Sequence, residues 1–364
     1  MSEPELVFAE TSPHGSVEAL IEQDERVAYF YLRGIEQNSF EMKSCWVRNL
    51  VPAPAELDRQ RMLEGRPPAL PEEFCRPGTT MQRLDEKRLR LVWFEEGDGA
   101  ALLEDDQLLA VIPAWSGQEG FCGYARDCGA ASPFCWPLPV GETLQDRVRS
   151  ADRFWKSWET EDSPWAVYEP RILEQYEEAF GSLQGYYSID GGHWPPRTLA
   201  RFHWENRIVL LTAGNSLLPQ PGVEMAFENP KTFRRFEVGC CLDESASQAL
   251  VESCGKYLGG QTALPWSQLT FLAHGHTISC EMFLKAESLP DFSSILLLAQ
   301  DKVAGIQKQV APAEIFGEPV SLLWSLPLFE NERKYLQETM NFSLLDKILS
   351  GQGLPMIEPR SMVL

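Results

Sequence analysis

Two histidines and a cysteine lie close together in the C-terminal half of the sequence. His274 and His276 are separated by one residue, and Cys280 follows four residues later. Because alternate residues of a strand share one face, the two imidazoles could converge on a metal ion or serve in acid–base chemistry. The spacing supplies no fourth ligand, so a purely structural role for both histidines remains the alternative.

The other candidate nucleophiles lack a catalytic context. Cys240 and Cys241 lie in an apolar run, where burial raises the pKa of a thiol and leaves it inert. Ser216 is not in the G-x-S-x-G arrangement that exposes a nucleophilic serine. The Gly-Lys pair at 255–256 has no glycine at the upstream spacing of a phosphate-binding loop. We therefore assign no catalytic residue and expect no cofactor.

The nine cysteines are scattered, and no C-x-x-C pair occurs among them. Cys122, Cys128 and Cys135 have five and six residues between them, which matches no standard zinc pattern. The odd number of cysteines and the length of the chain favour reduced thiols over a disulfide framework. We expect no metal site.

Six carboxylates gather around a predicted turn in the N-terminal half. They are Glu95, Glu96, Asp98, Glu104, Asp105 and Asp106. One interpretation is a partner-binding decoy surface, whose carboxylates would compete with phosphate for the basic cleft of a nuclease. The other is a solvated hairpin end with no specific role. Calcium binding is disfavoured because the spacing of an EF-hand is absent.

The net charge excludes several classes of function. The chain has 32 Lys and Arg against 53 Asp and Glu, a formal charge of −21 at pH 7. Direct binding to nucleic acid needs a basic footprint, and an anionic membrane would repel such a chain. A basic protein partner is compatible with this charge, because opposite fields speed and orient association. The simplest alternative is that the charge only maintains solubility.

The length of 364 residues predicts about two domains. We place an N-terminal α+β region at 1–160, a second domain at 161–352 and a frayed tail at 353–364, with a helical junction between the domains. No apolar run approaches the ~20 residues that span a bilayer. The N-terminus lacks the apolar core of a signal peptide, so we expect a cytoplasmic protein.

The elements that must position these residues follow from hydrophobic periodicity. Segments rich in β-branched and aromatic residues predict strands; they are 27–33, 45–50, 89–94, 108–113, 185–190, 201–212, 234–242, 293–299 and 320–328. Apolar residues at helical spacing predict helices; they are 143–158, 170–180, 245–258 and two pieces of 330–349 broken near Asn341. The third helix would end at Gly259-Gly260.

The first 25 residues are polar, and we expect loose order there with one short helix around 17–22. The fold class that the whole pattern predicts is α+β. Its sheets would be mixed and largely antiparallel, flanked by helices, in two domains.

Four segments of the second half occur in a fixed order. They are LLTAGNSLLPQPG at 210–222, RRFEVGCCL at 234–242, HGHTI at 274–278 and SLPLFENERKYLQET at 325–339. Their order and spacing, over about residues 180–350, resemble the Suppressor of fused domain in the version found in bacterial proteins. Two departures are that Asn215 stands where the family usually has Met, and that the Pro-Trp pair often following the second segment is missing.

The resemblance implies structural roles for the motif residues, with the two histidines bonding backbone groups in a turn. These residues are Thr212, Gly214, Ser216, Pro221, His274, Gly275, His276, Pro327, Leu328, Glu332 and Tyr335. The first half of the chain resembles a segment that accompanies this domain in longer bacterial proteins.

Members of the family are not known as enzymes. The animal member sequesters a transcription factor, and bacterial members resemble immunity proteins that neutralise toxins, often nucleases. The resemblance therefore implies a non-catalytic immunity protein that occludes a cognate, basic toxin domain. Two alternatives stay open: a metal-dependent or Cys/His hydrolase, and a regulatory scaffold that binds another cytoplasmic protein.

Overall fold

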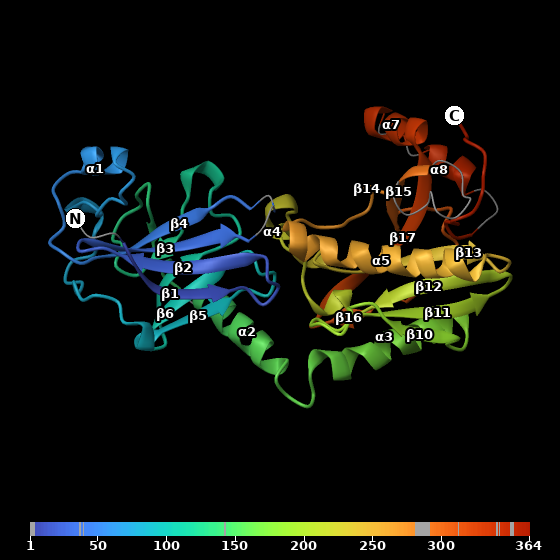
Figure 1. Ribbon diagram of the computed structural model, residues 1–364, viewed down its shortest axis with the longest axis horizontal. Coiled ribbons are helices and arrows are strands. Elements are labelled where there is room, and N and C mark those ends of the chain that lie inside the picture. Colours follow the sequence, from blue (N-terminus) through green and yellow to red (C-terminus); the bar gives the residue numbers. More distant parts are fainter. Residues whose placement is uncertain are drawn as a thin grey trace. The chain divides into compact units, whose positions relative to one another are not determined.

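The computed structural model describes the chain except residues 1–3, 36, 37, 39, 142, 281–291, 312, 340, 342 and 350–352. The chain divides into two compact units (Figure 1). Unit 1 consists of Met1–Glu159, Glu224–Ala226 and Trp266–Thr270, and unit 2 of Thr160–Val223, Phe227–Pro265 and Phe271–Leu364. Within the described part of the chain, every helix is too short or too polar to cross a membrane.

Unit 1 contains two sheets. The first is antiparallel in the order β1-β2-β3-β4, with strands Glu5–Thr11, Val17–Gln23, Val27–Gly34 and Lys43–Asn49. The second has the order β5-β6-β7-β8-β9, with strands Leu89–Trp93, Ala100–Glu104, Gln107–Ile112, Tyr124–Ala125 and Trp136–Pro137. A short helix, α1, spans Arg59–Leu63, and single 3-10 turns lie at Glu72–Phe74, Glu86–Arg88 and Gln118–Gly120.

The expected helix around 17–22 is wrong, because these residues form strand β2. Val17, Ala19 and Ile21 are fully buried on one face, while Glu18 and Glu22 on the other face are only half-buried. This alternation has the period of two that belongs to a strand with one face on a core. The N-terminal segment is therefore part of the first sheet, paired with β1 and β3.

Both sheets of unit 1 contribute to one hydrophobic core. Phe30 and Trp46 come from the first sheet and Leu102 and Leu109 from the second, and none is more than 1% exposed. Burying a side chain of this size stabilises a fold by about 1.5–3 kcal/mol. Helix α2, Thr143–Ser157, begins at the predicted residue and packs beside β5.

Unit 2 is built on one larger sheet of mixed direction. Its order is β10-β11-β12-β13-β17-β15-β14, with β16 added on β17, and only the β13–β17 pair is parallel. The strands are Gly185–Ser188, Thr198–Trp204, Arg207–Ala213, Arg235–Asp243, Thr277–Ser279, Phe292–Ala299, Glu314–Ile315 and Glu318–Phe329, for β10 to β17 in turn. The predicted strand at 201–212 is two strands, since β11 and β12 form a hairpin that turns at Glu205 and Asn206.

Two long helices cover opposite faces of this sheet (Figure 1). Helix α3, Pro164–Phe180, starts earlier than predicted because Ser163 caps it, accepting a hydrogen bond from Ala166 N at 3.4 Å. Helix α5, Gln248–Gln268, continues past the expected stop at Gly259-Gly260. An added Cβ on Gly259 would lie 3.3 Å from Ile189 Cβ, so this glycine permits close approach to a neighbouring segment.

The remaining helices of the described chain are short. They are α4 Val223–Ala226, α7 Glu330–Thr339 and α8 Ser343–Ile348, together with single 3-10 turns at Asn215–Leu217 and Pro230–Thr232. The last two helices confirm the predicted break near Asn341. Helices and largely antiparallel sheets in both units confirm the predicted α+β class.

The C-terminal tail is packed against the sheet of unit 2, which corrects the expectation that it is frayed. Leu354, Met356 and Ile357 are buried. The backbone of Met356 pairs with that of Cys241, and Ile357 N donates to Cys241 O at 2.8 Å. The tail is apolar at these positions and therefore gains from covering the end of β13.

Candidate functional site

The turn that follows β12 encloses one buried carboxylate. Glu237, in the neighbouring strand β13, is 1% exposed. It accepts five hydrogen bonds, from Thr212 Oγ1 at 2.7 Å, Gly214 N at 2.9 Å, Asn215 Nδ2 at 2.8 Å, Ser216 N at 3.0 Å and Ser216 Oγ at 2.5 Å. The structure thus brings three of the predicted motif residues, Thr212, Gly214 and Ser216, around Glu237, a residue that the sequence analysis did not single out.

This arrangement leaves Glu237 little capacity to bind anything else. A carboxylate offers about four lone-pair positions, and the five donors of the turn occupy them. Burial raises the pKa of Glu237, while the bonds from Ser216, Thr212 and Gly214 act in the opposite direction. Glu237 therefore holds the turn in shape and is not placed to act on a substrate.

The hydroxyl of Thr212 is also fully engaged in hydrogen bonds within the turn. It donates to Glu237 and accepts from Val238 N at 2.8 Å and Asn215 Nδ2 at 2.9 Å. Its backbone carbonyl accepts from the Tyr176 hydroxyl of α3 at 2.8 Å. Asn215, where the family usually has Met, is thus accommodated because its amide joins the bonds around the carboxylate.

Only glycine fits at position 214. Its φ of +114° is one that side chains rarely adopt. A Cβ added there would lie 2.6 Å from Pro196 O and 2.8 Å from Trp165 Cζ3. The turn therefore depends on Gly214 for both its backbone conformation and its contact with the segment before β11.

The proline loop is anchored by a residue that the sequence did not reveal. Pro221 is buried, and the neighbouring Gln220 is fully buried. Gln220 Nε2 donates to Phe233 O at 3.0 Å and to Leu272 O at 3.1 Å, and Leu272 N donates to Gln220 Oε1 at 2.7 Å. A glutamine in a loop carries no local signal of such bonds, because its partners are distant in the sequence.

His274 and His276 each bond a backbone group. Ala299 N donates to His274 Nδ1 at 3.3 Å, and His276 Nδ1 lies 3.2 Å from Phe271 O. Gly275 between them has a φ of +88°, as a tight turn requires. Burial lowers the pKa of both histidines.

The structure does not join these histidines to Cys280 in a metal site. Cys280 is buried, and its Sγ lies 3.7 Å from Phe292 O. Across the described ranges, no three or more His, Cys, Asp or Glu side chains are grouped so that they could hold a metal ion. Cys240 and Cys241 are also buried, and burial contributes to raising the pKa of both thiols above its usual range.

A second buried carboxylate holds the C-terminal tail. The Glu332 side chain is fully buried and forms a two-bond ion pair with Arg360, with Nη2 to Oε2 at 2.6 Å and Nη1 to Oε1 at 2.7 Å. Phe329 N and Val363 N donate to the same carboxylate at 3.1 and 3.0 Å, and Arg360 Nη2 also donates to Pro327 O at 2.8 Å. Burial acts to raise the pKa of Glu332, but these donors outweigh burial and the pKa is lowered.

The last two motif residues lie in the same region. Leu328 is fully buried in β17. The Tyr335 hydroxyl accepts a hydrogen bond from Asn341 Nδ2 at 3.1 Å, which links α7 to the segment before α8. Both residues are structural. Arg360 was missed by the sequence analysis because the tail was expected to be frayed.

Four of the six carboxylates in the acidic cluster of unit 1 are buried, so the cluster is not one open surface; only Asp105 and Asp106 fit the solvated hairpin end that the sequence suggested. Glu95, Glu96, Asp98 and Glu104 are between 2% and 6% exposed. Buried carboxylates require partners, and for Glu95, Glu96 and Glu104 the partners are arginines far along the chain. Arg147 pairs with Glu95 at 3.2 Å and with Glu96 at 2.7 Å.

Glu104, Asp105 and Asp106 are also paired with arginines. Glu104 contacts Arg48 at 2.7 Å and Arg126 at 3.0 Å, in the interior of unit 1. Asp105 and Asp106 are exposed, and they pair with Arg88 and Arg90 respectively. The six carboxylates therefore do not form one decoy surface.

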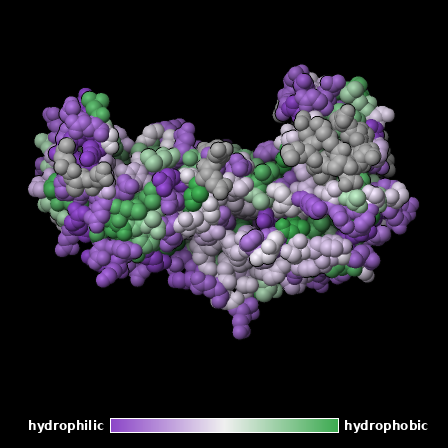
Figure 2. Space-filling model, in the orientation of Figure 1, coloured by the Kyte–Doolittle hydropathy of each residue, from purple (hydrophilic) through white to green (hydrophobic). Residues whose placement is uncertain are grey.

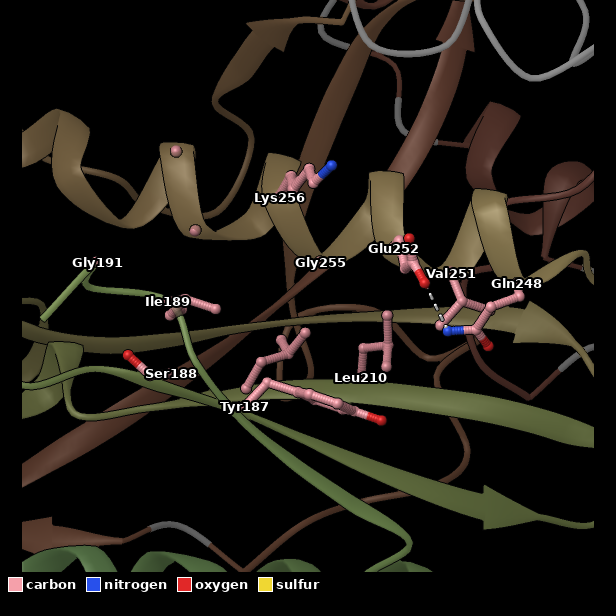
Figure 3. Close-up of a pocket in the computed structure, with 13 residues that line it drawn as sticks. Tyr187, Ser188, Ile189, Gly191, Leu210, Gln248, Val251, Glu252, Gly255 and Lys256 are labelled. Carbon is pink, nitrogen blue, oxygen red and sulfur yellow. Dashed lines mark hydrogen bonds between the residues drawn. The ribbon is translucent and has the colours of Figure 1, made fainter.

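A cavity of about 660 Å³ in unit 2 lies between α5 and the β10 edge of the sheet. Figure 3 shows Tyr187 and Leu210 on the strand side and Val251 on the helix side. Gln248 Nε2 donates to Glu252 Oε1 at 3.0 Å on the helix. The volume and the apolar walls are typical of a binding pocket.

This cavity can hold an apolar group but offers no obvious chemistry. No cysteine or histidine is among the residues that line it. The helix wall carries Gly255, Gly259 and Gly260, and an added Cβ on Gly260 would meet nothing within 4 Å. The sequence analysis missed this cavity because it ended the helix at the glycine pair.

On the face shown in Figure 2, hydrophobic patches are separated by hydrophilic residues.

Comparison with known proteins places these features in a family. The family model described as Suppressor of fused protein (SUFU) matches residues 194–360. These residues include the turn around Glu237, the His274–His276 turn and the Glu332–Arg360 pair. A search of curated proteins finds no match.

Two solved structures are similar to part of the chain. One, described as the Sufu-Fu complex crystal structure, has a TM-score of 0.37 and 12% identity, and covers 53% of this chain and 91% of that chain. The other, the crystal structure of Drosophila Suppressor of Fused, has a TM-score of 0.37 and 10% identity, and covers 52% of this chain and 50% of that chain. The family match therefore identifies a Suppressor of fused domain at residues 194–360 of this chain.

Proposed function

We propose that this chain is a non-catalytic cytoplasmic protein that holds a protein partner and occludes the partner's functional surface. The family match over residues 194–360 is the observation that carries the proposal. The partner we propose is a toxin domain with a basic active cleft, for which this chain acts as the immunity protein.

The use of the polar motif residues supports binding over catalysis. A catalytic acid, base or nucleophile must reach a substrate. Glu237 is saturated by the turn around it, and Glu332 is held by Arg360. His274 and His276 bond backbone groups. These side chains serve the shape of the domain, so its function is expected to lie in its surface.

The cavity beside α5 supplies a place for an anchor. Nanomolar affinity corresponds to about −12 kcal/mol, and a few buried anchors usually provide most of it. Tyr187, at the cavity, is 48% exposed, and Tyr186 and Trp194 nearby in sequence are 43% and 41% exposed. Such aromatic side chains are enriched at the energetic centres of interfaces. We place an apolar side chain of the partner in this cavity.

The charge of the chain supports a basic partner. A net charge of −21 attracts a basic domain over long range and accelerates encounter. Because four of the six clustered carboxylates are buried, this field comes from acidic residues spread over the surface. Charge then orients the partner, and the apolar anchor holds it.

The experiment is co-expression of this chain with the product of the gene immediately upstream. We expect the upstream product to be toxic alone, harmless when co-expressed, and recovered with this chain as a stoichiometric complex. Recovery of this chain alone, with toxicity unchanged, contradicts the proposal. A scaffold without a toxin predicts a complex with a non-toxic partner. A hydrolase predicts bound metal or turnover in the purified protein.

A further inference from the structure

Two cysteines of unit 1, Cys75 and Cys128, lie directly opposite each other. Cys75 follows the 3-10 turn at Glu72–Phe74, and Cys128 lies between β8 and β9. Their backbones form an isolated antiparallel bridge. The bridge therefore joins the long proline-rich segment before β5 to the loop after β8, although these two parts of unit 1 are far apart in the sequence.

The hydrogen bonds around the bridge define the kind of pair that the two cysteines form. One backbone bond flanks the pair on each side, from Arg76 N to Asp127 O at 2.9 Å and from Gly129 N to Phe74 O at 2.7 Å. The N–H groups of Cys75 and Cys128 do not bond each other but donate within their own segments. Cys75 and Cys128 are therefore a non-hydrogen-bonded pair, in which the Cα atoms are about 4.5 Å apart and the side chains share one face.

This pair has the backbone geometry that a disulfide requires. Disulfide-bonded cysteines have Cα atoms about 4.4–6.8 Å apart, a range that includes the spacing of a non-hydrogen-bonded pair. Gly129 permits the close approach, because an added Cβ there would lie 2.9 Å from Cys75 O. A disulfide between Cys75 and Cys128 thus needs rotation of the two side chains and little movement of the backbone.

The two thiols are free to make this rotation. Cys75 Sγ donates to Leu70 O at 3.5 Å, and Cys128 Sγ donates to Ala130 O at 3.1 Å. These are weak hydrogen bonds within each cysteine's own segment, because a thiol is a weak donor. Breaking them costs far less than forming a covalent bond returns. Cys128 Sγ also lies 3.6 Å from Cys135 O, so Cys135 is the competing partner for Cys128.

Exposure determines which thiol reacts first. Of the nine cysteines, only Cys75 and Cys122 are half-buried, and the other seven are buried. A small molecule can therefore reach Cys75, while Cys128, which is 1% exposed, can be reached by Cys75 from within the fold. Burial raises the pKa of Cys75 to about 11, so its thiolate is scarce at neutral pH and its exchange reactions are slow.

We propose that Cys75 and Cys128 form a reversible disulfide by exchange with a small-molecule disulfide such as glutathione disulfide. Cys75 loses its proton, attacks one sulfur of glutathione disulfide and releases one glutathione thiolate. Cys128 then loses its proton, attacks Cys75 Sγ and releases the second. The two thiolates take up the two protons, so that two protein thiols are oxidised and one glutathione disulfide is reduced.

The new bond would fasten the segment before β5 to the interior of unit 1. Cross-linking distant residues stabilises a fold mainly by restricting the unfolded chain, and more so for long loops. Asp127, next to Cys128, pairs with the buried Arg48 at 2.9 Å, so the bond would be formed beside the ion-paired interior. The site is independent of the cavity beside α5 and of the proposed partner.

The test is equilibration of the reduced full chain with excess glutathione disulfide, followed by alkylation of the remaining thiols and mass spectrometry. The oxidised chain should carry seven alkylated cysteines, two fewer than the nine of the reduced chain. Digestion with chymotrypsin, which can cleave at Phe134 between Cys128 and Cys135, should yield a peptide pair joining Cys75 to Cys128. A Cys128–Cys135 disulfide, a persistent mixed disulfide at Cys75, or nine alkylated cysteines overturns the proposal.

Thermal unfolding tests the stabilising effect of the bond. The cross-linked chain should melt about 5 °C or more above the reduced chain, and dithiothreitol should restore the lower melting temperature. A cross-linked chain that melts no higher than the reduced one contradicts a bond formed at the native geometry.

Three variants identify the pair. Cys75→Ser should lose both the cross-link and the rise in melting temperature, and Cys128→Ala provides the same test if Cys75→Ser fails to fold. Cys122→Ser is the matched control, because it removes the other half-buried thiol and should keep both effects. A rise in melting temperature on oxidation of Cys75→Ser or Cys128→Ala, or its loss in folded Cys122→Ser, overturns the assignment.

Discussion

Ser216 and Glu237, 21 positions apart in the sequence, are joined by two hydrogen bonds to the same carboxylate oxygen. The backbone N–H of Ser216 donates at 3.0 Å and its hydroxyl at 2.5 Å. Together with Thr212, Asn215 and Gly214, they fix the turn after β12 onto strand β13. The turn is therefore a rigid part of the Suppressor of fused domain.

Replacing Glu237 should destabilise the domain strongly. In Glu237→Gln, an amide NH₂ would face the donors that now bond a carboxylate oxygen, leaving buried N–H or O–H groups unpaired. We expect a loss of about 2–4 kcal/mol in the free energy of unfolding, measured with urea. Glu244→Gln, whose side chain is 53% exposed just beyond β13, should change little. Equal stability of both variants would show that the bonds to Glu237 contribute nothing.

Two glycine-to-alanine substitutions, one in the turn after β12 and one in α5, should change the stability in opposite directions. Gly214→Ala should destabilise by about 2 kcal/mol or more, because the φ is +114° and the added Cβ meets Pro196 O at 2.6 Å. Gly260→Ala, inside α5 with nothing within 4 Å, should stabilise by about 0.5–1 kcal/mol. Thermal unfolding of both variants decides this, and stabilisation by Gly214→Ala would contradict the geometry of the turn.

Through the Glu332–Arg360 ion pair, the C-terminal tail should contribute to the free energy of unfolding. Arg360→Ala leaves a fully buried carboxylate without its cation, which costs about 3–5 kcal/mol. Lys334→Ala removes an exposed pair with Glu330 and should have little effect. Urea unfolding at pH 7 compares the two variants. A tail that is frayed in solution would make Arg360→Ala as mild as Lys334→Ala.

The Glu332–Arg360 pair should also make the stability of the folded protein fall as the pH is lowered. The pKa of Glu332 is lowered in the folded protein, so its contribution is present above the usual value of 4.5 and is lost as the pH falls through the folded pKa. The stability difference between the wild type and Arg360→Ala should therefore shrink below pH 4.5. A difference that stays constant from pH 7 to the acid limit of folding would contradict this role.

The buried carboxylates of unit 1 should respond differently from the exposed ones. Arg48→Met removes the partner of Glu104 and Asp127 in the interior and should destabilise by about 3–5 kcal/mol. Arg88→Met removes only the exposed pair with Asp105 and should cause no measurable change. Denaturant unfolding of both variants provides the comparison. Similar results for the two would mean that burial of Glu104 is not maintained in solution.

Local periodicity predicted much of the fold, and long-range contacts account for what it missed. The strands around 27–33 and 89–94 and helix α2 have strong local patterns, and the structure contains them. In contrast, Arg48 and Glu104 are 56 positions apart, so burial of that carboxylate left no local signal. Helix α5 crosses its glycine pair because packing against Ile189 overrides the usual preference for ending there.

The sequence predicted the domain that contains the site, but not all the residues that hold the site together. The order of the four motifs led to the domain, and the family match confirmed it. Glu237 and Arg360 were not found, because each acts through partners brought together only by the fold. The cavity beside α5 was not predicted, because its wall includes the glycine pair at which the sequence analysis ended that helix.

Titration of the upstream gene product with this chain tests the central claim most directly, with binding and loss of toxic activity measured together. The wild type should bind at one-to-one stoichiometry and abolish the activity. Gly260→Leu, which adds a side chain at a residue that lines the cavity beside α5, should stay folded but bind at least about tenfold more weakly, while Gly260→Ala binds normally. Absence of binding by the wild type, or equal binding by Gly260→Leu, would contradict a protein-occluding function centred on this cavity.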